Sequence, residues 1–333
     1  MGAATIAVMS SQTMNTASDA PALPATSPAE RRRSLTRRVR RYRVLYVLFL
    51  PAFVYFLTYK YYPIVLQTVL SLKDFNLSGG IWGSPWVGLE KFSELLSSAQ
   101  FGRLLRNTVV ISVMRIGFGF VPPIILSILL YDLRSAKLRR VAQTLVYIPH
   151  FFSWVIVYAI VFALFSNSGL INGFIVTLGG EPRNYLLSNR SFYPLLIGSA
   201  IWKQIGWGTI IYLAALTAID PQLFEAAKID GAGPLARIRH ITLPGIMPVM
   251  VFLLTLSIGQ IFQQAGAEQI LLFYSPATYE LGDIIDTWVY RVGLSQLKYS
   301  LGAAASFFQS SIGLALILIA NRLSVRYLGV GIW

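Results

Sequence analysis

The sequence predicts an all-α polytopic membrane protein with six transmembrane helices. Of its 333 residues, 55% are hydrophobic and 13% are charged, whereas soluble domains usually carry about 25% charged residues. The apolar residues come in continuous blocks, and a helix needs roughly 20 such residues to cross a bilayer. A membrane-spanning barrel is disfavoured because its strands alternate apolar and polar residues. Helices also satisfy their own backbone hydrogen bonds, which lipid cannot do for open strands.

The first span follows a polar and strongly basic segment. Residues 1–43 are expected to form a disordered cytoplasmic tail, because they are rich in Ala, Ser, Thr and Pro and end in an arginine cluster. The first apolar block lacks a small-residue cleavage site, so it is interpreted as an uncleaved span and not a signal peptide. Residues 44–333 would form the membrane domain. Its spans are expected at residues 44–66, 107–131, 141–165, 194–219, 245–266 and 304–324.

The distribution of basic residues predicts the orientation. With the amino terminus inside, most of the 28 Lys and Arg residues fall in segments expected in the cytoplasm, in agreement with the positive-inside rule. Both termini are therefore expected to be cytoplasmic. The same asymmetry accounts for most of the net charge of +14, so no nucleic-acid partner is expected. The absence of cysteine excludes disulfides and cysteine-based metal sites.

Two segments on the opposite side are too long to be simple turns. Residues 73–106 include an amphipathic helix expected at 89–105, and residues 267–303 are rich in Tyr and Trp. Aromatic residues of this kind often lie along a membrane interface. Contact with an external protein partner is the alternative interpretation.

Between the fourth and fifth spans lies a polar, basic loop, residues 220–244, with helix signals of its own. Asp220 can cap a helix, and Pro221 suits its first turn. Gly231 can end that helix in a left-handed conformation. The glycine–proline pair at 233–234 breaks the chain before a second short helix. We therefore expect a compact helix-turn-helix outside the lipid, directly followed by the fifth span.

This loop also carries a specific pattern. It has Glu-Ala-Ala, then a glycine after three residues, then Ile-x-Leu-Pro after nine more. The residues are Glu225, Ala226, Ala227, Gly231, Ile241, Leu243 and Pro244. An ordinary Ala-rich connecting helix is the plainer interpretation, but it does not account for the fixed glycine and the Ile-x-Leu-Pro end. The combination resembles the EAA loop in the permease subunits of ABC importers that use an external binding protein.

The resemblance implies a type I ABC importer permease fold in the bacterial cytoplasmic (inner) membrane. In that family, the short helix docks in a groove of the ATPase subunit and transmits ATP-driven closure to the spans. It implies a coupling role for Glu225, Ala226, Ala227, Lys228, Asp230, Gly231, Ile241, Leu243 and Pro244. It also implies several partners: a second permease subunit, two ATPase subunits, an extracytoplasmic solute-binding protein and membrane lipid.

Other segments are similar to the oligosaccharide branch of the family, which includes permeases for aldouronates and alginate-type oligosaccharides. They are residues 59–63, 73–75, 86–92 and 321–333. This resemblance implies that the cargo is a sugar or oligosaccharide, including anionic uronate oligomers such as alginate. The sequence has no Gly-x-x-x-x-Gly-Lys-Ser/Thr phosphate loop. The chain is therefore not expected to be an enzyme or to bind a cofactor, and ATP and Mg would belong to the partner ATPase subunits.

Polar residues within the spans are candidates for the substrate pathway. A charge inside a span is costly and usually faces the bundle interior or a water-filled cavity. Sugars bind through aromatic faces and amide hydrogen bonds. These arguments select Arg115, Trp202, Lys203, Gln204, Trp207, Gln260, Gln263 and Gln264. The alternative is that these side chains hold helices together. Two cations without a buried acid would suit an anionic uronate chain.

Other functional classes remain as alternatives. A secondary transporter or channel would act without an ATPase, but ion coupling usually needs intramembrane carboxylates or histidines. His150 is the one candidate and has no acidic partner in the sequence pattern. A membrane-embedded enzyme would need acidic or metal-binding residues clustered at one face, and none are found. A scaffold protein would have no need of charged spans.

Overall fold

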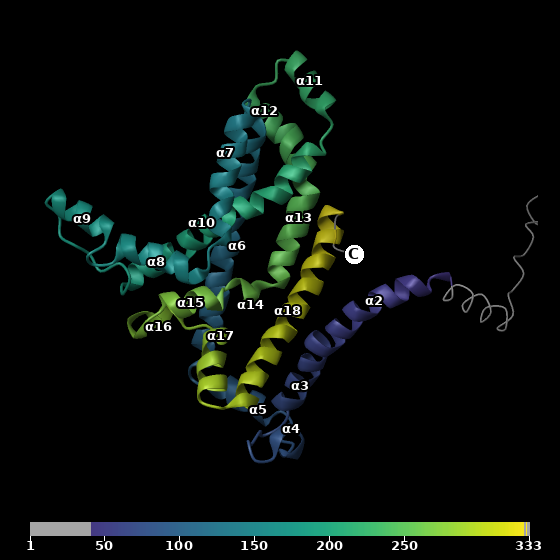
Figure 1. The fold of residues 1–333 in the computed structure, drawn as a ribbon, viewed down its shortest axis with the longest axis vertical. Helices are drawn as coiled ribbons and strands as arrows, with labels where there is room; N and C mark the ends of the chain where they lie inside the picture. Colours follow the sequence, from purple (N-terminus) through teal and green to yellow (C-terminus); the bar gives the residue numbers. More distant parts are fainter. Residues whose placement is uncertain (1–40, 330, 332–333) are drawn as a thin grey trace, which may run out of the picture. The chain divides into compact units, whose positions relative to one another are not determined.

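The computed structural model describes residues 41–329 and residue 331 (Figure 1). The predicted tail up to residue 40 therefore lies outside the described residues. Those described form helices and no β-strand, with one isolated bridge between Lys73 and Trp86. The all-α prediction is confirmed. The chain divides into two units, Met1–Ile64 and Val65–Trp333, and each is described by itself.

In the first unit, α2 (Arg43–Phe56) continues through the π-helical turn η1 (Leu57–Tyr61) into α3 (Tyr62–Ser71), which carries on across the unit boundary. This helical run is long and apolar enough to cross a membrane. It matches the span predicted at 44–66.

The second unit contains the remaining helices. They are α4 (Gly80–Gly83), α5 (Glu90–Ser97), α6 (Phe101–Asp132), α7 (Ala136–Tyr147), η2 (Ile148–Phe151), α8 (Trp154–Phe165), α9 (Leu170–Thr177), α10 (Asn189–Thr217), α11 (Pro221–Ile229), α12 (Pro234–Arg237), η3 (Ile238–Thr242), α13 (Leu243–Gly259), α14 (Ile261–Gln264), α15 (Ala267–Phe273), η4 (Pro276–Thr278), α16 (Tyr279–Gly282), α17 (Ile285–Trp288), η5 (Val289–Ser295) and α18 (Tyr299–Leu328). The amphipathic helix predicted at 89–105 is instead two helices, since α5 ends at Ser97 and α6 begins at Phe101.

Five helical runs in the described residues are long and apolar enough to cross a membrane. A sixth span is formed if α10 and α11, which meet at a bend of 72°, are taken together. The prediction of six spans agrees with this arrangement. The second, fourth and sixth predicted spans correspond to α6, α10 and α18.

The third span differs from the prediction of 141–165. The helix that starts in α7 stops at Tyr147, and the apolar run that could cross a membrane is Trp154–Thr177. Pro149 explains the break, because proline has no N–H to continue the hydrogen bonds of the α-helix. The chain passes through the short η2, and the Ser153 hydroxyl then accepts a hydrogen bond from the N–H of Ile156, which caps α8.

The fifth span also differs, because its helix starts and ends earlier than the predicted 245–266. It runs without interruption from Pro234 to Gly259. Gln260 leaves helical geometry, and Gly266 adopts a left-handed φ of 72° before α15, a conformation that favours glycine. The predicted start at residue 245 is wrong, because the π-helical turn η3 leads directly into α13. That turn suits a proline that has no N–H to contribute.

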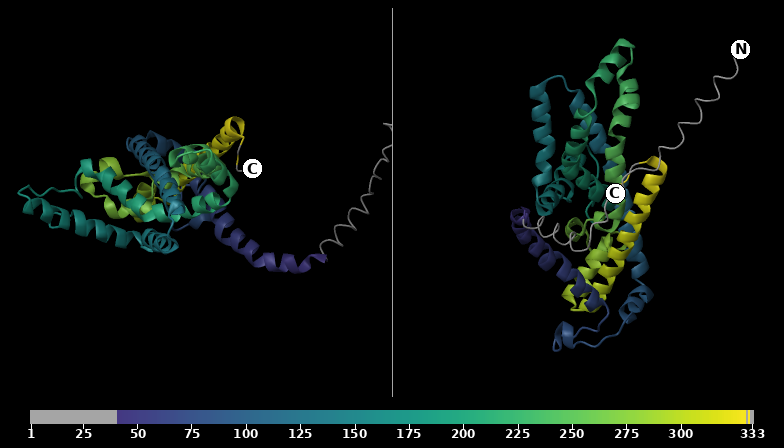
Figure 2. Two further views of the ribbon diagram at one scale, coloured as in Figure 1. Left: turned by 90° about the horizontal axis from the view of Figure 1, so that it is seen from above. Right: turned by 90° about the vertical axis from the view of Figure 1, so that its right-hand side faces the viewer.

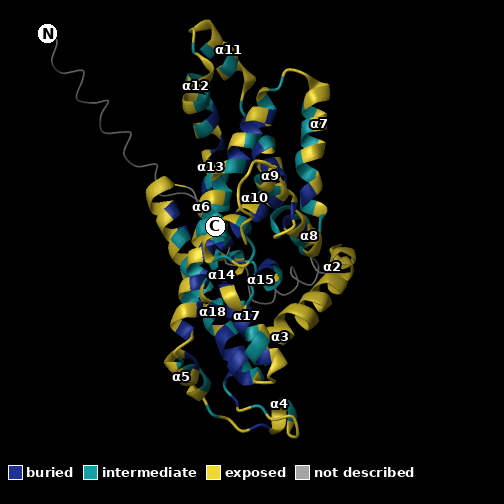
Figure 3. Ribbon diagram, turned by 90° about the vertical axis from the view of Figure 1, so that its left-hand side faces the viewer, coloured by how far each residue is buried: buried dark blue, intermediate teal, exposed yellow. Residues whose placement is uncertain are grey.

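The core of the second unit consists of three clusters of buried apolar residues, and α6 contributes to each of them. One cluster joins α6 to α14, α17 and α18, a second joins it to α8, α10 and α15, and a third joins it to α10 and α13. The views agree that α11 and α12 lie at one end of this unit and α4 and α5 at the other (Figure 2). Both α11 and α12 are without buried residues (Figure 3).

Candidate functional site

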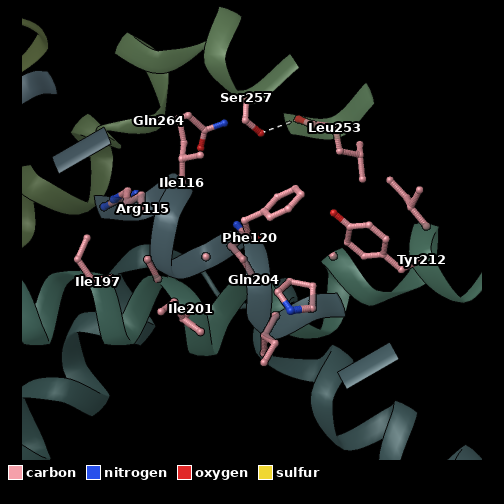
Figure 4. Close-up of a pocket in the computed structure, with 16 residues that line it drawn as sticks. Arg115, Ile116, Phe120, Ile197, Ile201, Gln204, Tyr212, Leu253, Ser257 and Gln264 are labelled. Carbon is pink, nitrogen blue, oxygen red and sulfur yellow. Dashed lines mark hydrogen bonds between the residues drawn. The ribbon is translucent and has the colours of Figure 1, made fainter. Parts of the chain in front are cut away.

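A pocket of about 280 Å³ lies among α6, α10, α13 and α14. Most of its lining is apolar, including Phe120, Ile201 and Leu253 (Figure 4). Its polar side chains are Arg115, Gln204, Tyr212, Ser257 and Gln264. The Ser257 hydroxyl already donates to the carbonyl of Leu253, at 2.9 Å. An apolar hollow with a few polar groups is typical of a small-molecule site. We call it the arginine pocket.

The Arg115 side chain is held in place by Gln269 of α15. Gln269 is fully buried, and its amide nitrogen donates to the carbonyl of Leu196 at 2.9 Å and to the hydroxyl of Ser199 at 2.8 Å. Its amide oxygen therefore faces Arg115 and accepts a hydrogen bond from the guanidinium. The Arg115 Nε is buried and has no hydrogen-bond partner among the described residues. The guanidinium is thus fixed in position while its buried Nε–H stays unused.

Lys203 has a different environment from the one expected of a substrate contact. It is 7% exposed, and its ammonium donates to the carbonyls of His150 and Phe152, both at 2.6 Å. It also lies 5.5 Å from the ring centroid of Trp154. These contacts hold the turn between α7 and α8, which is the structural alternative weighed for this residue.

The aromatic residues near Lys203 fall into two groups. The His150 ring stacks on Trp207, with centroids 4.3 Å apart and an angle of 5° between the planes. His150 also contacts the Gln204 side chain at 3.0 Å, and Gln204 lines the arginine pocket. Trp202, in contrast, lies near Phe152, with centroids 6.2 Å apart, and does not line that pocket. The structure therefore brings Gln204 and Trp207 together and leaves Trp202 apart.

The three glutamines of the fifth predicted span do not form one cluster. Gln264 lines the arginine pocket, whereas Gln260 and Gln263 line a second pocket of about 470 Å³. The break at Gln260 separates them. The second pocket is also lined by Asp286, Ser306, Gln309 and Ser310, and we call it the aspartate pocket.

The sequence reasoning selected Gln260 and Gln263 of the aspartate pocket and missed Gln67, Asp286, Ser306, Gln309 and Ser310. Asp286 lies between the predicted spans, so it is not found when only the charged residues inside those spans are considered. Gln309 is only 7% exposed although it lies in an apolar span. Ser306, Gln309 and Ser310 share one face of α18 at helical spacing, and this polar stripe was the signal that would have revealed the pocket.

The 220–244 loop has the local geometry that its sequence predicts. The Asp220 carboxylate accepts a hydrogen bond from the N–H of Gln222 at 2.9 Å and so caps α11. Gly231 has a left-handed φ of 75°. The N–H of Ala232 then bonds to the carbonyl of Ala227 at 2.8 Å, which closes the helix end.

The surface of this loop is exposed and mixed in character. The side chains of Leu223, Ile229 and Leu235 are 52%, 86% and 81% exposed. Glu225 and Asp230 lie exposed on the same short helix or at its end. Exposed apolar groups bordered by carboxylates are typical of a protein-binding surface. On the inner side, Phe224 packs near Tyr131 of α6, with ring centroids 6.3 Å apart.

Comparison with known proteins gives a consistent result. Residues 123–328 match the family described as binding-protein-dependent transport system inner membrane component. The chain is 44% identical over 305 residues to the polygalacturonan/rhamnogalacturonan transport system permease protein YteP of Bacillus subtilis (strain 168), covering 91% of this chain and 94% of that protein. It is 40% identical over 290 residues to protein LplB of the same organism, covering 87% and 91%.

Among solved structures, the chain is similar to one chain of a bacterial alginate ABC transporter in complex with an alginate pentasaccharide-bound periplasmic protein. The TM-score is 0.81 at 36% sequence identity, and the match covers 89% of this chain and 99% of that one.

Proposed function

This chain belongs to the family of binding-protein-dependent transport system inner membrane components, and on that premise we propose that it forms half of an import pathway for an acidic oligosaccharide. It is a permease subunit of a sugar or oligosaccharide ABC importer and is not itself an enzyme. Family membership implies a partner permease, an ATPase and a solute-binding protein. The finer statements below concern the cargo and the coupling.

The observation that carries the acidic cargo is the Arg115 guanidinium. It lies at the edge of a mostly apolar pocket, is fixed by Gln269, and keeps a buried Nε without a partner in the described chain. A carboxylate at that position would complete its hydrogen bonds and gain from the low dielectric around it. The two proteins named for polygalacturonan/rhamnogalacturonan and for alginate support this choice, since both names denote polysaccharides with carboxylate-bearing rings.

Lys203 is not proposed as a main contact for the acidic ring, because its ammonium already donates hydrogen bonds to two backbone carbonyls. Gln204, Gln264 and the His150–Trp207 stack would contact the sugar rings through amides and aromatic faces. Their position in or beside the arginine pocket supports that role.

We further propose that the 220–244 loop couples this pathway to ATP hydrolysis on two separate subunits. Its exposed Leu223 and Ile229, with Glu225 beside them, would dock on the ATPase surface. ATP-driven closure would then move the loop and the spans, giving alternating access from the two sides of the inner membrane. Both termini would be cytoplasmic, on the same side as the loop.

An ion-driven secondary transporter is the alternative, and Asp286 is the observation that favours it. Asp286 is half-buried, and a carboxylate inside a membrane protein can couple transport to an ion gradient. Membership of a binding-protein-dependent family weighs against this alternative, since such systems depend on other subunits for energy.

Uptake by the assembled importer in proteoliposomes tests the proposal. A uronate oligosaccharide should enter only with ATP and the binding protein, and Arg115→Gln should reduce its uptake by about tenfold or more, as expected for a lost charge-assisted contact. Arg103→Gln is the matched control, because Arg103 is exposed on the same helix and lines neither pocket. Uptake driven by an ion gradient without ATP would contradict the proposal. Equal uptake by the wild type and the Arg115 variant would refute the assignment of an acidic cargo.

A further inference from the structure

The aspartate pocket is lined by uncharged polar groups and one carboxyl group. A site for a purely acidic oligosaccharide would not need this combination. Its volume of about 470 Å³ is larger than that of the arginine pocket and falls within the range of ligand sites. Its polar groups are the amides of Gln67, Gln260, Gln263 and Gln309, the hydroxyls of Ser306 and Ser310, and the carboxyl group of Asp286.

These groups suit a ligand with many hydroxyls and no charge. Amides and hydroxyls both donate and accept hydrogen bonds, and an ionised carboxylate accepts only. A sugar hydroxyl can satisfy each of them, because it is also both a donor and an acceptor. A uronate carboxylate would instead face Asp286, and two like charges in a partly buried site repel strongly.

A metal ion does not fit the same set. Only one carboxylate lines the pocket, and no group of three or more His, Cys, Asp or Glu residues that could hold a metal occurs in the described part of the chain. Hard cations take several oxygen ligands at short distances, whereas this hollow is far larger than one ion.

The two pockets share a wall. Leu253 and Ser257 of α13 line the arginine pocket, and Gly259 at the end of the same helix lines the aspartate pocket. In α14 the consecutive residues Gln263 and Gln264 line the aspartate pocket and the arginine pocket respectively. Their Cα atoms are about 3.8 Å apart, as in any trans peptide. The two pockets therefore lie on either side of the α13–α14 segment, with only its backbone and side chains between them.

We propose that the aspartate pocket is a subsite for a neutral sugar ring, so that this permease favours oligosaccharides in which acidic and neutral rings occur together. The arginine pocket would take the uronate ring and the aspartate pocket an uncharged ring of the same oligosaccharide. This inference rests on the proposed function, because it assumes that the arginine pocket binds an acidic ring.

Equilibrium binding to the assembled importer in nanodiscs, without the binding protein, tests this directly. The two probes are tetragalacturonate and a tetrasaccharide that alternates galacturonate with rhamnose. The wild type should bind the mixed probe about tenfold more tightly, equivalent to about 1.4 kcal/mol. Asp286→Asn keeps the shape and removes the charge, so it should tighten tetragalacturonate binding and bring the ratio of the two affinities close to one.

Two further variants separate the possible outcomes. Glu280→Gln makes the same chemical change at an exposed carboxylate that lines neither pocket, and it should leave the ratio at the wild-type value. Gln309→Leu removes an amide from the aspartate pocket and should weaken only the mixed probe. An unchanged thermal unfolding midpoint in the nanodiscs shows that Asp286→Asn is folded.

The failures of the two proposals differ. In one outcome, the wild type binds both probes while Asp286→Asn leaves the ratio of their affinities unchanged or weakens both equally. That result would refute the neutral subsite and leave the proposal of an acidic cargo intact. If the wild type binds neither probe, the acidic cargo itself is wrong, and the subsite falls with it.

Discussion

Lys203→Met gives the sharpest test of how the intramembrane charges are used. Methionine keeps the apolar stem and removes the ammonium that donates to the carbonyls of His150 and Phe152. A fully buried acceptor left without a donor costs about 1–3 kcal/mol. Both hydrogen bonds here are partly buried, so about 2–6 kcal/mol is the upper limit for the two carbonyls together. We expect a clearly lowered thermal unfolding midpoint, because the turn between α7 and α8 loses both hydrogen bonds from the Lys203 ammonium.

The assay is thermal unfolding of the importer in nanodiscs, followed by equilibrium binding of the uronate probe at low temperature. Lys203→Met should unfold earlier and still bind the probe with affinity close to that of the wild type. Lys203→Arg, which keeps a charged donor, should recover part of the stability. An unchanged unfolding midpoint with a large loss of uronate binding would refute this reasoning and make Lys203 a substrate contact.

Three further predictions follow from the geometry. Gly231→Ala places a side chain at a left-handed φ of 75°, which costs about 1–2 kcal/mol; it should lower binding-protein-stimulated ATPase activity, while Gly231→Asn retains more of it. Arg291→Met leaves the 1% exposed Asp283 without its ion pair at 2.6 Å, so stability should fall by about 3–5 kcal/mol, and adding Asp283→Asn should restore part of it in thermal unfolding. Burial raises the pKa of the Asp286 carboxyl above 3.8, while the hydrogen bond from Gln309 lowers it; the preference for the mixed probe should therefore weaken as pH falls through this pKa, and binding by Asp286→Asn should lack that change.

Local signals were enough to predict the 220–244 loop. The cap at Asp220 and the left-handed Gly231 depend on residues within a few positions of each other, and the structure has both. The six apolar blocks were also predictable, because bilayer thickness fixes their length. The functional role of the loop stays a prediction.

The pockets could not be derived in the same way, because they depend on residues far apart in the chain. Lys203 meets its carbonyls across 51 and 53 positions, and Arg115 meets Gln269 across 154. The break at Gln260 is what sends neighbouring glutamines to different pockets. An unbroken helical span was expected there, so the amides were grouped as one cluster.

The uninterrupted helix from Pro234 to Gly259 connects the 220–244 loop to the wall between the two pockets. With 26 residues at 1.5 Å each, it is about 39 Å long, and a tilt of about 10° around one end would displace the other by about 7 Å. Its far end carries Ser257 on one side and Gly259 on the other. A small movement at the loop would thus widen one pocket as it narrows the other, so the contacts of a bound sugar in the two pockets would change together and in opposite directions.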